Sequence, residues 1–357
     1  MTPRVLEFLR RNATLLMRLL PLVAFAVPLL WLYLLQPGSF ELMWKGRTFE
    51  LFFVWLILLE IILGWESLQP VKVKAAFSSR SFLLVVALLL PTVFVVASNY
   101  MGLSVAVADT ARQSGIYWWS DMPIAVEYVV FAAMFSLMAI LLFGGNGLKF
   151  FSIPILFSAL IGGIFIIDNV YPYDQFTPFQ FLVPMTTWFA SNALSLMGYS
   201  TSLDLSRGNL PSLTVTDPNN TARTTTFAIA WPCAGIESLL IFTVTILLFL
   251  KRMPISWKAK VGYFAFGAMI TYFINILRIA SIYLVSLNGG NVDVFHSTYG
   301  PLYPIAWIVS YPLIIMGSQT AWQRLKKSKP EEPHDKPADT TAPAEAKRPQ
   351  QSQPSLA

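Results

Sequence analysis

The chain has 357 residues, of which 55% are hydrophobic and only 12% are charged. Ordinary soluble domains contain about 25% charged residues, so this composition excludes a soluble globular protein. The formal net charge of +6 does not indicate nucleic-acid binding, because the basic residues lie mainly in short loops and flanks, where they orient membrane proteins. A single cysteine, Cys233, excludes an intrachain disulfide.

Apolar stretches long enough to cross a bilayer recur along the chain. Eight candidate spans lie at residues 19–35, 49–65, 81–98, 123–143, 150–167, 234–250, 261–287 and 302–322. The first is predicted to be a retained helix and not a signal peptide, because it is long, contains Pro21 and Pro28, and lacks a small-residue cleavage site. The sequence therefore predicts an all-α fold, a polytopic transmembrane helical bundle.

A ninth apolar stretch, residues 176–197, is much richer in Thr, Ser, Asn and Pro than the eight spans. Basic clusters favour the cytoplasmic side of a membrane. The chain has four basic clusters, and all four reach the cytoplasmic side only if an even number of spans separates the two termini. We therefore expect residues 176–197 to be re-entrant or to lie along the outer interface. The clusters are at residues 4–11, 72–80, 251–260 and 324–329.

With this topology, residues 199–232 form an extracytoplasmic loop. Alternating polar and apolar residues predict a short strand at 212–216, and Asp217-Pro218-Asn219 predicts a turn, so the loop has some β character. The expected organisation is N-terminal transmembrane helices at 1–175, an interfacial segment and loop at 176–232, a catalytic transmembrane core at 233–323, and a disordered cytoplasmic tail at 324–357.

Three residues with useful chemistry are expected to reach the outer leaflet. Cys233 lies just before the span that enters from outside, and His296 follows the outer end of the 261–287 span. Arg278 lies 17 residues into that span, which is roughly 25 Å from its cytoplasmic start. Because all three reach the same depth, they are candidates for one site.

These residue types suit acyl transfer. The amides at a helix N-terminus favour a thiolate, so we expect the pKa of Cys233 to be lowered. A histidine can take the thiol proton or protonate a leaving amine. An arginine stays charged, so Arg278 is suited to stabilising an oxyanion or binding a carbonyl.

Each residue also has an ordinary structural interpretation. A lone membrane cysteine is usually an apolar filler, and a lone loop histidine is usually a polar surface group. Arg278 needs a partner inside the membrane, and Glu237, one turn below Cys233, is the obvious candidate, with Asn275 on the same face as Arg278. Glu60, in the second span, is either protonated or faces a polar partner.

Three short motifs resemble those of the exosortase/archaeosortase family. Residues 232–236 (Pro-Cys-Ala-Gly-Ile) resemble its cysteine motif, 275–278 (Asn-Ile-Leu-Arg) its arginine motif, and 296–300 (His-Ser-Thr-Tyr-Gly) its histidine motif. Position 234 is alanine where many members have serine. Each motif alone is weak, but three in order on one membrane face form a specific match over about a quarter of the chain.

The resemblance implies a membrane cysteine protease or transpeptidase of surface-protein sorting. Its substrates would be secreted proteins that end in a short motif, a transmembrane helix and a basic cluster, with a lipid or another surface group as acceptor. Cys233 would be the nucleophile, His296 the acid/base and Arg278 the transition-state stabiliser, supported by Gly235, Glu237, Asn275 and Gly300. No metal or organic cofactor is implied.

The expected location is the cytoplasmic membrane, with the site on the extracytoplasmic side. Two other classes remain open. One is a transporter or polysaccharide-export component with Glu60, Glu237 and Arg278 along a pathway. The other is a scaffold that binds partner helices and does not need Cys233.

Overall fold

The computed structural model describes residues 13–41, 45–71, 79–172, 180–205, 210–300 and 302–327. The chain divides into two compact units, Met1–Ile314 and Ile315–Ala357. The first unit contains every candidate site residue. The disordered tail was expected at 324–357, but helix α15 continues to Lys327, so the first four of these residues are helical and the rest lie outside the described residues.

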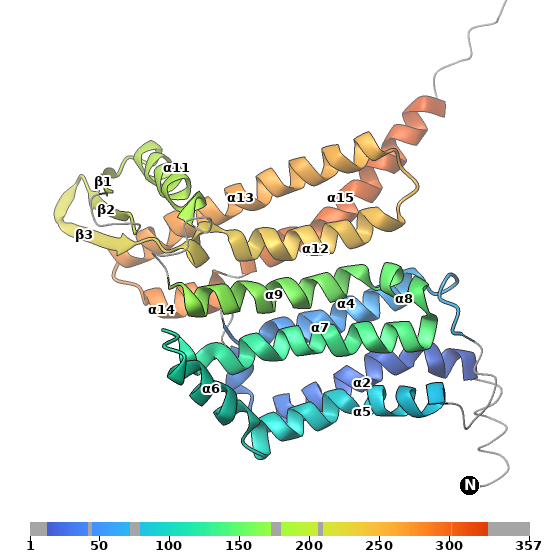
Figure 1. Ribbon diagram of the computed structural model, residues 1–357. Coiled ribbons are helices and arrows are strands. Elements are labelled where there is room, and N and C mark those ends of the chain that lie inside the picture. Colours follow the sequence, from blue (N-terminus) through green and yellow to red (C-terminus); the bar gives the residue numbers. More distant parts are fainter. Residues whose placement is uncertain are drawn as a thin grey trace, which may run out of the picture. The chain divides into compact units, whose positions relative to one another are not determined.

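Each of the eight expected spans is a helix, so the predicted all-α polytopic bundle is confirmed (Figure 1). Five helices in the described part are long and apolar enough to cross a membrane, at Leu15–Leu35, Ser81–Tyr100, Trp119–Phe143, Ser152–Val170 and Trp257–Leu287. The eight helices are α2 (Ala13–Leu35), α4 (Thr48–Leu63), α5 (Ser79–Tyr100), α7 (Met122–Phe143), α9 (Ser152–Val170), α12 (Ile236–Arg252), α13 (Trp257–Leu287) and α15 (Leu302–Lys327).

Shorter elements connect these helices. The helical ones are α3 (Gly38–Glu41), α6 (Leu103–Gln113), η1 (Trp119–Asp121), α8 (Gly145–Phe150), α11 (Leu182–Leu196), η2 (Trp231–Ala234), α14 (Val292–Val294) and η3 (Phe295–Tyr299). Three strands, β1 (Ser200–Asp204), β2 (Ser212–Asp217) and β3 (Asn220–Ala228), form an antiparallel sheet in the order β1-β2-β3.

Phenylalanine rings fill the centre of the N-terminal bundle, which comprises α2, α4, α5, α7 and α9. Phe25 packs edge-to-face on Phe53, Phe131 and Phe135 at centroid distances of 5.4, 5.4 and 5.6 Å. Edge-to-face pairs gain energy beyond their buried area. Helices α7 and α9 meet at Gly162, where a methyl group would lie 2.9 Å from the Ala125 carbonyl oxygen. Such close backbone approach is typical of transmembrane helix pairs.

The sequence predicted only part of the structure that follows α9. The strand expected at 212–216 is β2, and the turn after it is held by the Asn219 amide, which donates to Asp217 Oδ1 at 2.9 Å. The sequence did not predict β1 or β3. Helix α11 covers most of the apolar stretch expected at 176–197, of which residues 176–179 lie outside the described part of the chain. It packs on β1 and α13, and its placement as an interfacial or re-entrant segment stays a prediction.

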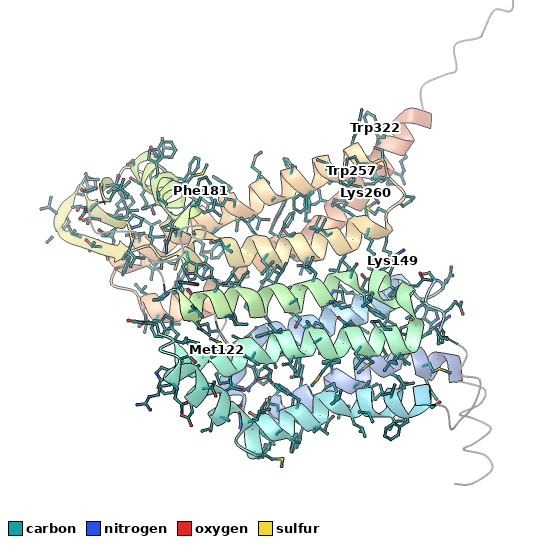
Figure 2. All side chains as sticks on the ribbon, viewed as in Figure 1. Met122, Lys149, Phe181, Trp257, Lys260 and Trp322 are labelled. Carbon is teal, nitrogen blue, oxygen red and sulfur yellow. The ribbon has the colours of Figure 1, made fainter. Side chains whose placement is uncertain are left out.

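Basic residues gather at the end of the bundle opposite to η2. Lys149, Trp257 and Lys260 lie toward that end in Figure 2, whereas Met122 and Phe181 lie toward the other. Glu60 is fully buried there and pairs with Lys251 at 3.0 Å and Arg252 at 2.7 Å. Glu60 therefore faces cationic partners, one of the two alternatives left open by the sequence.

Candidate active site

Cys233 lies in the 3₁₀ turn η2, where its amide donates to the Ala230 carbonyl oxygen at 3.0 Å. Gly235 follows with a φ of +92°, in the left-handed region that favours glycine. Helix α12 therefore begins at Ile236, two residues later than the start at position 234 that the sequence predicted. This correction places Cys233 in a turn of its own, ahead of the first helical turn.

His296 reaches Cys233 from a distant part of the chain. It lies in η3, a π-helical turn, and its Nε2 is 4.0 Å from Cys233 Sγ. Both side chains are half-buried. Proton transfer needs a shorter contact than this, but catalytic hydrogen bonds are often long until substrate binds. The thiol and the imidazole are thus placed to exchange a proton.

Arg278 on α13 lies against the turn that carries His296. A methyl group at Gly300 would lie 2.7 Å from Arg278 Nε and 2.9 Å from the His296 carbonyl oxygen. Only a residue without a side chain lets the guanidinium pack this closely on that backbone. Arg278 Nε is buried and has no hydrogen-bond partner. An unpaired buried N–H is costly, and here it leaves a donor against the backbone turn that carries His296.

Asn275, one turn before Arg278, holds the backbone of the cysteine turn. Its Nδ2 donates to the Cys233 carbonyl oxygen at 3.0 Å, and the side chain is 1% exposed. A methyl group at Gly235 would lie 2.9 Å from the same Nδ2. Gly235 is therefore needed for both its positive φ and its close contact with Asn275.

Glu237 interacts electrostatically with both Arg278 and Cys233. Within the described part of the chain, however, Glu237 and Arg278 do not form an ion pair at 4.0 Å or less. Their contact acts through charge over a longer distance and leaves the guanidinium donors available. The structure thus brings together all seven residues singled out in the sequence.

The pKa shifts of Cys233 and His296 favour a neutral thiol beside a neutral imidazole. Burial raises the pKa of the Cys233 thiol, and the Glu237 carboxylate adds to this, against the opposing effects of Arg278 and the Ala230 hydrogen bond. Burial also lowers the pKa of His296, as does Arg278, while Asp293 opposes. The expectation of a lowered thiol pKa is therefore wrong, because burial is the largest effect on the pKa of Cys233 and disfavours the thiolate.

Sequence reasoning missed the residues that anchor the cysteine turn to the N-terminal bundle. Trp231, two residues before Cys233, donates from Nε1 to Asp168 Oδ1 on α9 at 3.0 Å. Lys45 Nζ lies 2.8 Å from the other oxygen of Asp168. Thr186 on α11 donates to the Ala234 carbonyl oxygen at 3.3 Å. An aspartate near the end of an apolar helix is unusual, and this signal could have identified Asp168.

The fold and these residues define a polytopic membrane protein with a cysteine, a histidine and an arginine converging at one end of its bundle. The model of the transmembrane exosortase family matches residues 43–313, and the chain therefore belongs to that family. This confirms the resemblance seen in the motifs and identifies a membrane protein-sorting enzyme in broad terms. No curated protein and no solved structure matches the chain.

Proposed function

We propose that the chain is a membrane cysteine protease and transpeptidase that cleaves the C-terminal sorting signal of secreted surface proteins. The observation that carries the proposal is the 4.0 Å approach of Cys233 Sγ to His296 Nε2, with Arg278 against the histidine turn. The three residues come from three separate segments. Their convergence in a half-buried site supports a catalytic role more than chance packing.

The chemistry follows from the neutral state of the pair. The thiol proton passes to His296 Nε2 as Sγ bonds to the scissile carbonyl carbon, and the carbonyl oxygen becomes an oxyanion. The guanidinium of Arg278 stabilises this charge. The tetrahedral intermediate then collapses, its C–N bond breaks, and the imidazolium gives its proton to the leaving amine. A thioester to Cys233 remains.

The second half of the reaction releases the sorted protein. A nucleophile that carries a proton, either water or a group on a lipid or other surface acceptor, attacks the thioester carbonyl carbon. His296 takes its proton and returns one to Cys233 Sγ as the C–S bond breaks. With water as the nucleophile the enzyme acts as a protease, and with a surface acceptor as the nucleophile it acts as a transpeptidase. The sequence of steps requires no added redox partner.

The position of the basic residues supports an extracytoplasmic site. Lys251 and Arg252 end α12, and Cys233 precedes its start. Because basic loops favour the cytoplasm, the Cys233 end of the bundle faces outward in the proposed topology. Residues 251 and 237 are separated by about 21 Å along the helix. Glu60, paired at the far end, gives no support to a transporter pathway through Glu237 and Arg278.

Processing of secreted proteins in the host membrane tests this proposal. Cys233→Ala and Arg278→Ala are each expected to leave candidate substrates with intact C-terminal tails, as measured by mass spectrometry. The matched control is Ser310→Ala, whose hydroxyl is exposed and bonds only within its own helix. Normal processing by Cys233→Ala, in cells that contain no wild-type copy of this protein, would contradict the proposal.

A further inference from the structure

An apolar cavity of about 530 Å³ opens between α4, α12 and α15, away from the thiol. Its floor contains buried Phe49, Leu248 and Ile308. Its rim contains exposed Trp55 and Val309. A buried floor with an exposed rim describes a groove that is open sideways, toward the surroundings of the bundle.

All three helices present a regular face to this groove, and α4 contributes residues at positions 48, 49, 52, 55, 59 and 63. Helix α12 contributes Ile241, Thr245, Leu248 and Phe249, and α15 contributes residues at positions 305, 308, 309 and 312. Spacings of three and four residues place side chains on one side of a helix. Rows of this kind receive the ridges of another helix.

Thr245 is the unusual residue in the groove. Four threonines in the described part of the chain are buried, and three of them have hydrogen-bond partners: Thr187 and Thr271 donate to carbonyl oxygens four residues earlier, and Thr186 donates to Ala234. Thr245 is 7% exposed, lines the groove, and its Oγ1 has no partner. An unsatisfied hydroxyl in an apolar environment is costly unless an occupant of the groove pairs with it.

The groove leads to the candidate active site along two helices. Helix α12 starts three residues after Cys233, and Ile241 is five residues further along, about 8 Å below the start. Helix α15 starts at Leu302, just after Gly300, and Ile305 follows within one turn.

We propose that this groove receives the transmembrane helix of the sorting substrate, an inference that rests on the proposed function. Thr245 donates its hydroxyl hydrogen to a backbone carbonyl or a small polar side chain of the incoming helix. Small residues on that helix permit the close approach this bond requires. A lipid tail fills an apolar groove but has no acceptor at this depth.

Cysteine cross-linking in the full-length protein tests the location. Because Cys233 is the only cysteine, Cys233→Ala gives a background without thiols. Ile241→Cys and Val309→Cys place single thiols in the groove. Leu247→Cys and Ile314→Cys are matched controls, because both positions are exposed on the same two helices but lie outside the groove.

The probe is a reporter that ends in the tail of a secreted host protein whose processing depends on Cys233, with one cysteine in its apolar helix. Oxidation in membranes is expected to yield disulfides with the two groove thiols and none with the controls. Equal or stronger cross-linking at the controls would overturn the groove assignment. It would leave the proposed function intact, because cross-linking is read without cleavage.

Two further variants separate a helix from a lipid as the occupant. Thr245→Val replaces only the hydroxyl with a methyl group of similar size, so we expect about threefold to tenfold slower processing and rescue by Thr245→Ser. Ile305→Trp fills the groove, and we expect processing to fall while Cys233 still reacts with a small water-soluble thiol reagent. Normal processing by Ile305→Trp together with Thr245→Val would point to a lipid chain and overturn the proposal.

Discussion

The N-terminal bundle and the site region differ in how their buried charged groups are paired. In the N-terminal bundle, Glu60 is fully buried and has two cationic partners, and rings around Phe25 interlock. Around Cys233, Glu237 and Arg278 form no ion pair within 4.0 Å in the described part of the chain, and Arg278 Nε and Asn275 Oδ1 are buried without hydrogen-bond partners. The N-terminal bundle also contains buried polar atoms without hydrogen-bond partners, among them both carboxylate oxygens of Glu50, Glu127 Oε1 and both side-chain polar atoms of Asn169.

This difference separates the stabilising part of the molecule from its reactive part. Each unsatisfied buried group costs about 1–3 kcal/mol, and in the proposed mechanism the substrate oxyanion pairs with the one at Arg278. The Trp231–Asp168 hydrogen bond joins the two regions, because it fixes the cysteine turn to α9. Variants in the two regions are therefore expected to differ in kind as well as in size.

The largest expected effect comes from His296. His296→Ala removes the proton carrier, and processing is expected to slow by about 10²–10⁴. Thermal unfolding in detergent is expected to change little, because the side chain is half-buried. Similar losses of stability and activity would mean that the residue supports the fold and not the reaction.

The pH dependence of the wild-type rate sharpens the same point. Because the pKa of His296 is lowered, neutral imidazole persists on acidification, and the acid limb is expected below pH 6.5. Because the pKa of Cys233 is raised, the proton needed by the leaving amine is lost only above pH 9.0. An alkaline limb well below pH 9.0 would instead indicate a resting thiolate–imidazolium pair.

The N-terminal bundle is expected to show the opposite behaviour. Phe135→Ala removes a fully buried ring that packs on Phe25 and Phe53, and should lower the free energy of unfolding by about 3–5 kcal/mol. The rate per folded molecule should stay near wild type. A large fall in that rate, with the unfolding temperature unchanged, would erase the distinction between the two regions.

A methyl group at Gly300 tests the packing of Arg278. Gly300→Ala would displace the guanidinium or the histidine turn, and a shift of this size is expected to slow processing by about 10- to 100-fold. Gly262→Ala, in α13, is the control because its added methyl group meets open space. If both variants process at the wild-type rate, Arg278 does not need this contact.

The smallest expected effect is on the exposed face of the sheet. Thr226→Ala removes one hydroxyl contact, to Thr214 at 2.8 Å, and should cost less than about 1 kcal/mol. Processing is expected to be unchanged. A tenfold slower rate in this variant would extend the reactive region onto β3.

Hydropathy predicted the helices because apolar length is a local property, and the three motifs predicted which residues meet. The pKa of Cys233 was not predictable, because it depends on burial against a cluster that includes Val183 and Ile276 from elsewhere in the chain. The start of α12 was placed two residues early because Gly235 adopts a positive φ. Lys45 and Asp168 were missed because their pairing spans more than 120 residues.

Trapping the acyl intermediate tests the central claim most directly. Purified protein is mixed with the tail reporter, quenched in acid, digested and analysed by mass spectrometry. The account predicts a reporter fragment attached to the peptide that contains Cys233, released by neutral hydroxylamine as a thioester should be. Processed reporter without any adduct on Cys233, or an adduct on another residue, would contradict it.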